Sequence, residues 1–141
     1  MALELGSLRR AVDTLSRALD TERSFADAAA KDKGLSETLR AGVIQSFEVA
    51  YEQCWKMIQR WLRANRTPEA ADNPRTRKEL FRSAAREGLV RDPVEWFRFG
   101  EARNVTSHIY DEDKAAEVHG VAAEFAAEAR FLLEQLEARN D

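Results

Sequence analysis

Residues 36–65 read SETLRAGVIQSFEVAYEQCWKMIQRWLRAN, and this stretch decides the fold. Large apolar side chains return along it every three or four residues, the period that places them on one face of an α-helix. We expect this helix to be the central element, with Ser36 as its N-cap. Its inner face is predicted to consist of Leu39, Val43, Phe47, Tyr51, Trp55, Ile58 and Leu62.

Two further stretches carry the same period, one toward each end of the chain. A helix over about 3–29 is predicted by an apolar stripe that consists of Leu5, Leu8, Val12, Leu15 and Leu19. A helix over about 112–138, capped by Asp111, is predicted by a stripe that consists of Ala115, Val118, Ala122, Phe125, Ala129, Leu132 and Leu136.

Helix-start signals place two more helices between these stretches. Thr76 and Glu79 form a capping box that opens a short helix ending near Gly88. Asp92 followed by Pro93 opens a helix that extends to about residues 109–110. The proline-containing segment Thr67–Pro74 is predicted to be the longest loop. The sequence therefore predicts an all-α fold, a four-helix up-and-down bundle with one additional short helix.

Length and composition fit one domain over residues 1–141. The chain is 44% hydrophobic and 33% charged, which suits helices around a real core. It begins without a signal pattern and contains no apolar run of the roughly 18–20 residues that a membrane helix needs, so we expect a cytoplasmic protein. One cysteine, Cys54, and two histidines make a structural metal site improbable, and nothing in the sequence indicates a cofactor.

Charge is distributed unevenly along the chain. The net charge of −3 argues against a protein that coats nucleic acid through overall basicity. Residues 60–103 nevertheless carry eleven Arg and Lys against seven Asp and Glu, whereas residues 111–141 carry three against nine. The basic section could bind a phosphate backbone, or it could be a solvated helix face.

The basic section leads into residues 101–110, EARNVTSHIY. Arg103 and His108 are five residues apart, about 140° around a regular helix, so they converge only if the last turn loosens or if two copies meet. The simpler interpretation is a helix C-terminus at which His108 interacts favourably with the helix dipole and Asn104 faces solvent. Gly100, three residues before Arg103, is typical of a close approach by another backbone, although it could also be merely tolerated.

Cleavage of RNA by its own 2′-hydroxyl needs one group that takes a proton and another that supplies one, tasks suited to imidazoles. Each chain offers a single suitable histidine in this segment. A twofold homodimer would bring two copies of His108 and of Arg103 into one cleft, where the guanidiniums stabilise developing negative charge. This hypothesis requires no metal.

Residues 103–110, Arg-Asn-Val-Thr-Ser-His-Ile-Tyr, resemble the R-N-x-x-x-H-x-Y signature of HEPN-superfamily proteins. Residues 42–56, 79–90 and 106–112 are similar to the nucleotidyltransferase substrate-binding protein family, and the similarity extends over roughly 8–136. The resemblance implies a HEPN-like helical bundle that dimerises and is encoded beside a minimal nucleotidyltransferase.

The resemblance also implies an activity. Related members are toxins of toxin–antitoxin pairs: metal-independent endoribonucleases that a cognate minimal nucleotidyltransferase silences by transferring AMP to the motif tyrosine. By position, Arg103 would stabilise the phosphate and His108 would act as general acid and base. Asn104 would be an orienting group, and the hydroxyl of Tyr110 would be the one that is modified. An added nucleotide would place bulk and negative charge where RNA phosphates approach.

A second hypothesis belongs to a different class. The chain could be a non-catalytic adaptor that presents a substrate to its nucleotidyltransferase, with Tyr51, Trp55, Trp61 and Trp96 lining a pocket or interface. Core packing is the plainer role for these aromatic side chains.

Overall fold

The computed structural model describes residues 2–65, 76–108 and 111–140, and of His108 the backbone alone. Every regular element in these ranges is a helix, which confirms the all-α prediction. The elements are α1 (Gly6–Ser24), α2 (Ala26–Ala30), α3 (Lys33–Asn65), α5 (Arg77–Arg86), α6 (Pro93–Val105), the 3₁₀ turn η1 (Thr106–His108) and α7 (Glu112–Ala138). The loop predicted over Thr67–Pro74 lies outside the described residues.

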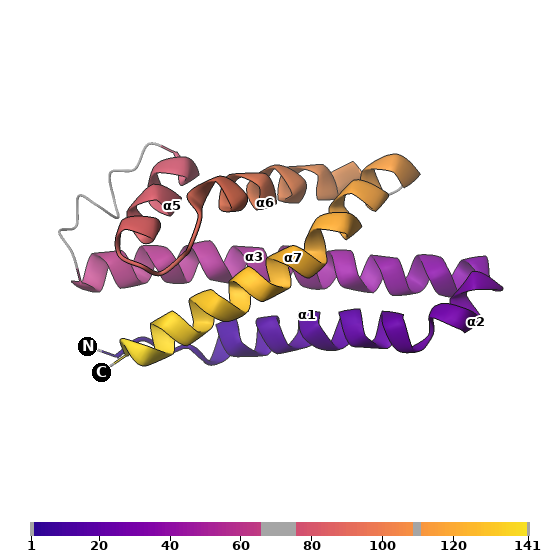
Figure 1. Cartoon of the computed structure of the whole chain (residues 1–141), viewed down its shortest axis with the longest axis horizontal. Helices are drawn as coiled ribbons and strands as arrows, with labels where there is room; N and C mark the ends of the chain where they lie inside the picture. Colours follow the sequence, from indigo (N-terminus) through magenta and orange to yellow (C-terminus); the bar gives the residue numbers. More distant parts are fainter. Residues whose placement is uncertain (1, 66–75, 109–110, 141) are drawn as a thin grey trace.

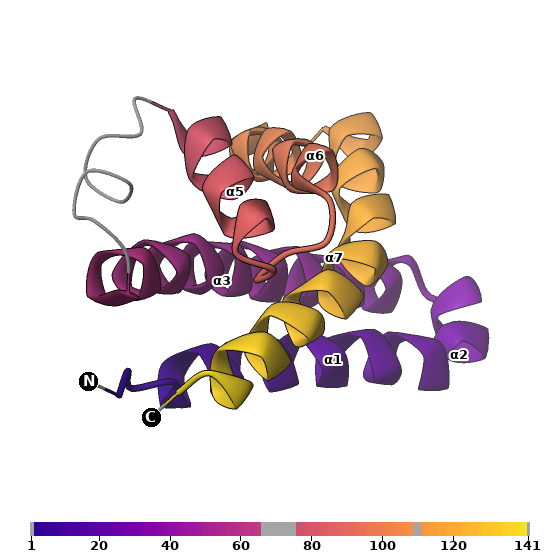
Figure 2. The same cartoon turned by 60° about the vertical axis from the view of Figure 1, so that its left-hand side comes forward.

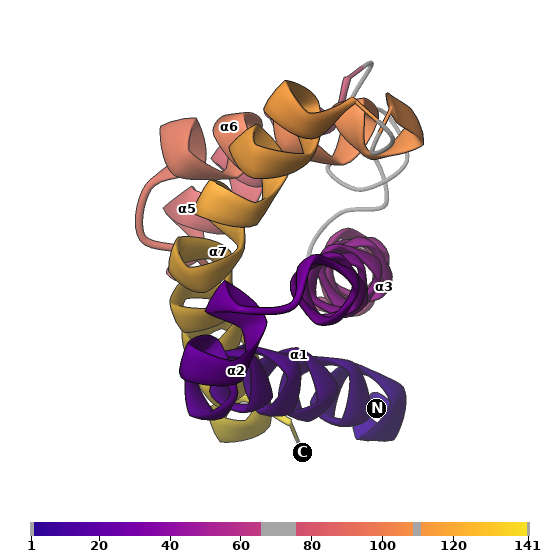
Figure 3. The same ribbon diagram turned by 90° about the vertical axis from the view of Figure 1, so that its right-hand side faces the viewer.

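The long helices α1, α3, α6 and α7 alternate in direction, as predicted for an up-and-down bundle (Figure 1). α3 lies at the centre and contacts α1, α5, α6 and α7. The short helix α5 lies beside α6, on the side of α3 away from α1 (Figure 2). α7 crosses obliquely and connects the α1 layer to the α6 layer (Figure 3). The R-N-x-x-x-H-x-Y signature at residues 103–110 is called the motif below. Its described part, residues 103–108, lies at the end of the bundle where α6 ends.

An aromatic cluster joins three of these helices. The ring of Phe125 in α7 lies 5.0 Å from that of Phe47 in α3, and 5.2 and 5.7 Å from those of Phe99 and Trp96 in α6. Each of these contacts is edge-to-face, the arrangement that aromatic rings prefer. All four side chains are fully buried. The cluster fixes α6, and with it the motif, against the rest of the bundle.

Three of the predicted N-caps form. The Thr76 hydroxyl accepts a hydrogen bond from the Glu79 amide at 3.3 Å, Asp92 accepts one from Val94, and Asp111 accepts from the first turn of α7. Gly88 follows α5 with φ of +78°, the left-handed conformation that closes helices. The sequence signals thus place the starts of α5, α6 and α7 correctly.

Two predictions for the first half were wrong. The helix predicted over 3–29 breaks at Phe25 into α1 and α2. Phe25 is 51% exposed and no residue of α2 is buried, so core burial does not favour a straight continuation of α1. Ser36 is not the N-cap of α3, which begins at Lys33. The Asp32 carboxylate instead accepts a hydrogen bond from the Leu35 amide at 3.1 Å, so an earlier residue with a stronger acceptor takes that role.

The two ends of the chain lie together (Figure 1). The Leu3 amide donates to Asn140 Oδ1 at 2.7 Å, and Asn140 Nδ2 donates to the Leu3 carbonyl oxygen at 3.0 Å. Among the described residues, no helix combines the length and the apolarity needed to cross a membrane.

Candidate functional site

The motif lies where α6 ends. The α-helix stops at Val105, and Thr106–His108 continue as a 3₁₀ turn before Asp111 caps α7. The last turn thus tightens and does not loosen, so convergence of Arg103 and His108 across two copies of the chain stays a prediction. The side chain of His108 and the whole of Tyr110 lie outside the described residues.

Arg103 is held on two sides. Its Nη1 donates a hydrogen bond to the Thr106 hydroxyl at 2.8 Å, and its Nε lies 3.4 Å from Glu52 Oε1 of α3. Glu48, one helical turn earlier on α3, places Oε2 at 3.8 Å from Nη2. The Arg103 side chain is 31% exposed, so part of the guanidinium still faces solvent. An arginine held in this way loses little conformational entropy when it meets an anion.

Thr106 makes two hydrogen bonds to Arg103. Its hydroxyl accepts from Arg103 Nη1 and also donates to the Arg103 carbonyl oxygen at 2.7 Å, so it closes the helix and fixes the side chain together. The residue is 3% exposed, which shields both hydrogen bonds from water.

Glu52 is itself held in place. Its Oε2 accepts a hydrogen bond from Trp55 Nε1 at 3.0 Å, which leaves Oε1 toward Arg103. Trp55 was predicted on the inner face of α3, but it is only partly buried. Leu39 is also only partly buried, whereas the other predicted residues of this face are buried, together with Cys54, Met57 and Trp61.

Asn104 faces a different environment from Arg103. It is exposed and lines an open cavity of about 530 Å³ between α3, α5 and α6. Phe97 and Gly100, which share its helical stripe, line the same cavity. Arg103 and Asn104, adjacent in sequence, therefore face the α3 carboxylates and this cavity respectively.

The neighbour that approaches Gly100 closely is the side chain of Tyr51, and not another backbone as we expected. A Cβ atom at this position would lie 2.9 Å from the Tyr51 hydroxyl oxygen. Tyr51 is 1% exposed, and burial raises the pKa of its phenol, against a smaller opposing effect of Arg77. A neutral phenol therefore occupies the space that a side chain at position 100 would need.

The cysteine, the second histidine and two of the tryptophans take part in packing or in contacts between helices. Cys54 is fully buried. The second histidine, His119 of α7, lies 2.7 Å from a carboxylate oxygen of Glu22 of α1 and joins those two helices. Trp96 and Trp61 lie in the core, as the plainer interpretation of the aromatic residues held. Across the described part of the chain, no group of three or more His, Cys, Asp and Glu side chains is placed to hold a metal ion.

Comparisons with known proteins identify the family. A family model described as "Nucleotidyltransferase substrate binding protein like" matches residues 3–138. The chain belongs to the nucleotidyltransferase substrate-binding protein family. This confirms the resemblance drawn from the motif and from the α3 and α5 segments.

Two matches in Haemophilus influenzae illustrate the relationship. One, named "Probable ribonuclease HepT", is 40% identical over 106 residues, which is 75% of this chain and 73% of that protein. The other is a solved structure described as revealing the fold of a substrate binding domain of a nucleotidyltransferase. It superposes with a TM-score of 0.88 at 33% identity, covering 95% of this chain and 99% of that one. The likeness to a HepT protein agrees with the HEPN-type motif at residues 103–110.

Sequence reasoning missed three residues of the site: Glu48, Glu52 and Thr106. A signal for the first two was present, since two acids four residues apart on the central helix form one pair on a single face. Thr106 lies within the quoted motif, but its role depends on the 3₁₀ turn, which the sequence did not predict.

Proposed function

We propose that this protein is a ribonuclease of HEPN type and the toxin of a toxin–antitoxin pair, acting as a homodimer. Arg103 carries the proposal: it stands five residues before His108 in the motif, its guanidinium donates a hydrogen bond to Thr106, and Glu52 lies 3.4 Å from its Nε. The relative named as a probable ribonuclease supports the same class of activity.

In the proposed reaction, the ribose 2′-hydroxyl attacks the adjacent phosphorus atom. One His108 imidazole takes the hydroxyl proton, and the protonated imidazole of the other subunit gives a proton to the departing 5′-oxygen. The products are a 2′,3′-cyclic phosphate and a free 5′-hydroxyl. The guanidinium of Arg103 stabilises the charge on the phosphate oxygens, and Asn104 orients the substrate.

Two carboxylates near Arg103 compete with RNA phosphate for its guanidinium. Glu48 and Glu52 place two carboxylates within 4 Å of one guanidinium. These groups are about one-third exposed, so solvent weakens their attraction to Arg103 to roughly 1 kcal/mol or less. Phosphate oxygens can then still bind the exposed part of the guanidinium.

We further propose that a cognate minimal nucleotidyltransferase silences the protein by transferring AMP to Tyr110. The tyrosine stands two residues after His108 in the segment that joins α6 to α7. A nucleotide at this position would add negative charge beside the two copies of His108 in the proposed dimer and repel RNA.

The decisive experiment measures cleavage of RNA by the purified protein with a chelator present. We expect cyclic phosphate ends from the unmodified chain and none from His108→Ala or Arg103→Ala. Arg17→Ala is the matched control, because Arg17 lies on α1, away from the motif, and donates a hydrogen bond to Thr14 of its own helix at 3.3 Å. Unchanged cleavage by His108→Ala would contradict the mechanism.

A non-catalytic adaptor is the second candidate, favoured by the description of the solved relative as a substrate binding domain. Expression of the chain without the neighbouring gene separates the two candidates, since growth should stop only for a nuclease. Mass spectrometry of the peptide containing Tyr110, after incubation with the partner and ATP, tests the modification.

A further inference from the structure

The cavity beside Asn104 has a polarity that suits a nucleotide. Its α5 edge carries two exposed cations, Arg77 and Lys78, and its α6 edge carries Asn104 and Glu101. Aromatic side chains, including Phe97 of α6, line the space between the two edges. A volume of about 530 Å³ lies within the roughly 300–1,000 Å³ of small-ligand sites.

The cation at the cavity edge is oriented by its neighbours. The guanidinium of Arg77 lies over the Trp55 ring, 4.2 Å from its centroid, and Nη1 lies 3.5 Å from the Tyr51 hydroxyl, to which it donates. Stacking on an aromatic face holds a guanidinium flat while leaving its edge for an anion. Arg77 is therefore placed to meet a phosphate with little reorganisation.

Arg82 adds a third cation, which lies with Lys78 near the Phe97 ring. Lys78 Nζ and the Arg82 guanidinium lie 5.4 and 5.2 Å from the centroid of the Phe97 ring. α5 as a whole carries four basic residues and one acidic residue, although the chain is acidic overall. Basic side chains interleaved with aromatic rings are what single-stranded nucleic acid requires, since rings stack on bases and cations follow the backbone.

The cavity is continuous with the motif. Asn104, which lines it, follows Arg103 directly, and Gly100 lies one turn earlier on the same face of α6. Because Gly100 lacks a side chain, nothing from this position enters the cavity. Glu101 repels anions at the α6 edge, so a phosphate is favoured at the α5 edge, beside Arg77 and Lys78.

We propose that this cavity is a subsite for single-stranded RNA. It would take the nucleotide next to the cleaved bond, with its base against Phe97 and its phosphate on Arg77 and Lys78. The inference rests on the proposed ribonuclease function, because it assigns that function's substrate to a second contact. It also gives the α5 basic residues a role that the cleavage motif does not need.

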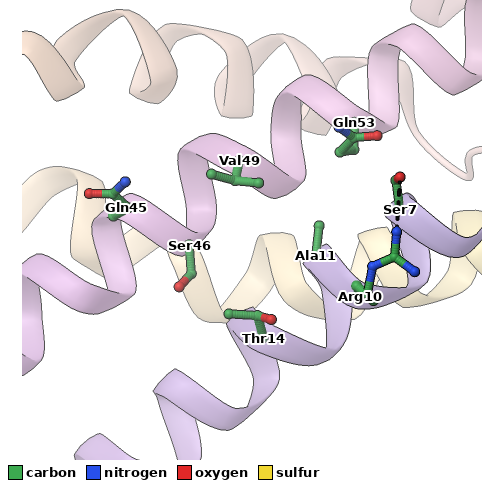
Figure 4. A pocket seen from close by; sticks show the side chains of 8 residues that line it. All are labelled: Ser7, Arg10, Ala11, Thr14, Gln45, Ser46, Val49 and Gln53. Carbon is green, nitrogen blue, oxygen red and sulfur yellow. Dashed lines mark hydrogen bonds between the residues drawn. The ribbon is translucent and has the colours of Figure 1, made fainter.

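A second hollow, between α1 and α3, lacks these features (Figure 4). It measures about 300 Å³, and its lining contains one cation, Arg10, and no aromatic ring. The other side chains that line this hollow are small or uncharged, and Figure 4 shows Ser7 next to Arg10. Without a stacking surface this hollow is a poor RNA site, so Arg10 makes a suitable control.

The test measures binding of a fluorescent single-stranded RNA to full-length protein carrying His108→Ala, so that cleavage does not interfere. We expect Arg77→Ala with Lys78→Ala to weaken binding about tenfold, and the slope of log K against log salt to fall by about 1.4 for two lost phosphate contacts. The control, Arg10→Ala with Arg17→Ala, removes the same charge from α1. Equal binding by the two double variants would overturn the proposal.

The stacking contact has its own variants. Phe97→Ala should weaken RNA binding about five- to hundredfold, while Phe97→Tyr, which keeps a ring, should bind normally. Circular dichroism of both variants checks the fold, and the tyrosine variant keeps the test valid if the alanine variant unfolds. Normal binding by a folded Phe97→Ala protein would contradict a base at this position.

Two further outcomes distinguish failure of the RNA subsite from failure of the proposed ribonuclease function. If the α5 double variant binds and cleaves RNA normally but loses AMP transfer from the nucleotidyltransferase, the surface contacts that protein and the RNA subsite is wrong. If the chain with an intact His108 binds RNA through Arg77 and Lys78 but never cleaves it, the ribonuclease proposal fails while the subsite stands. A chain that binds no RNA overturns both.

Discussion

The Thr106 hydroxyl contacts Arg103 twice, accepting from Nη1 at 2.8 Å and donating to its carbonyl oxygen at 2.7 Å. A single hydroxyl therefore links the backbone that ends α6 to the side chain expected to meet phosphate. Thr106 touches no reacting atom in the proposed mechanism and acts through Arg103. It is a positioning residue, and a change there should affect turnover more than folding.

The first prediction replaces Thr106 by Val, which has nearly the same shape but no hydroxyl. We expect kcat for RNA cleavage to fall about 10- to 100-fold, because a hydrogen bond to a charged group contributes about 1.5–3 kcal/mol. KM should change little, since the guanidinium remains present. Thr106→Ser keeps the hydroxyl and should restore most of the rate. A valine variant with unchanged kcat would show that the guanidinium needs no such support.

The second prediction separates the two carboxylates that face Arg103. Glu52 lies nearer and is fixed by Trp55, whereas Glu48 lies at 3.8 Å. Glu52→Gln should tighten RNA binding about two- to fivefold by removing a negative charge, yet lower kcat by loosening Arg103. Glu48→Gln should tighten binding and leave kcat unchanged. Fluorescence titration and single-turnover cleavage measure the two quantities separately, and equal kcat values for the two variants would refute the positioning role of Glu52.

Much of the fold followed from the sequence because its signals are local. The apolar stripe of α7 is buried at every predicted position, and the caps at Thr76, Asp92 and Asp111 form as expected. The break at Phe25 was missed because helix propensity continues through the alanine-rich segment, whereas the burial of side chains in the core does not. Propensity is visible in the sequence, but the presence of a packing partner is not.

The candidate site could be predicted less completely. The sequence located Arg103, Asn104, His108 and Tyr110 by their spacing, but not the environment of Arg103. Glu52 is 51 residues away along the chain, and only the packing of α3 on α6 brings it to the guanidinium. Contacts between distant segments carry no periodic signal, so a single sequence does not reveal them.

The third prediction concerns Gly100. Replacement by Ala gains about 1 kcal/mol of helix propensity. It also sets a methyl group 2.9 Å from the hydroxyl of Tyr51, whose side chain is buried, and overpacking of this kind costs about 1–3 kcal/mol. We expect Gly100→Ala to lower the free energy of unfolding by about 1 kcal/mol in denaturant titrations.

Two other glycines provide the control for this prediction. A Cβ atom at Gly42 in α3 or at Gly120 in α7 meets nothing within 4 Å. Gly42→Ala and Gly120→Ala should therefore stabilise the protein by about 0.5–1 kcal/mol. Tyr51→Phe should rescue Gly100→Ala, because it removes the oxygen that the methyl group would meet. Failure of that rescue would place the clash elsewhere.

The last prediction concerns Cys54, whose thiol is fully buried and whose pKa burial raises. Because the thiolate is the reactive form, the native protein at pH 8 should react with an aromatic disulfide reagent at least about 100-fold more slowly than the unfolded chain. Above about pH 8.5 the unfolded chain releases this proton while the folded chain retains it. The free energy of unfolding should therefore fall as the pH rises from 8.5 to 10, more steeply than in Cys54→Ala by up to about 1.4 kcal/mol per pH unit. Below pH 8 the two proteins should show the same pH dependence, and equal slopes above pH 9 would mean that the thiol ionises within the folded bundle.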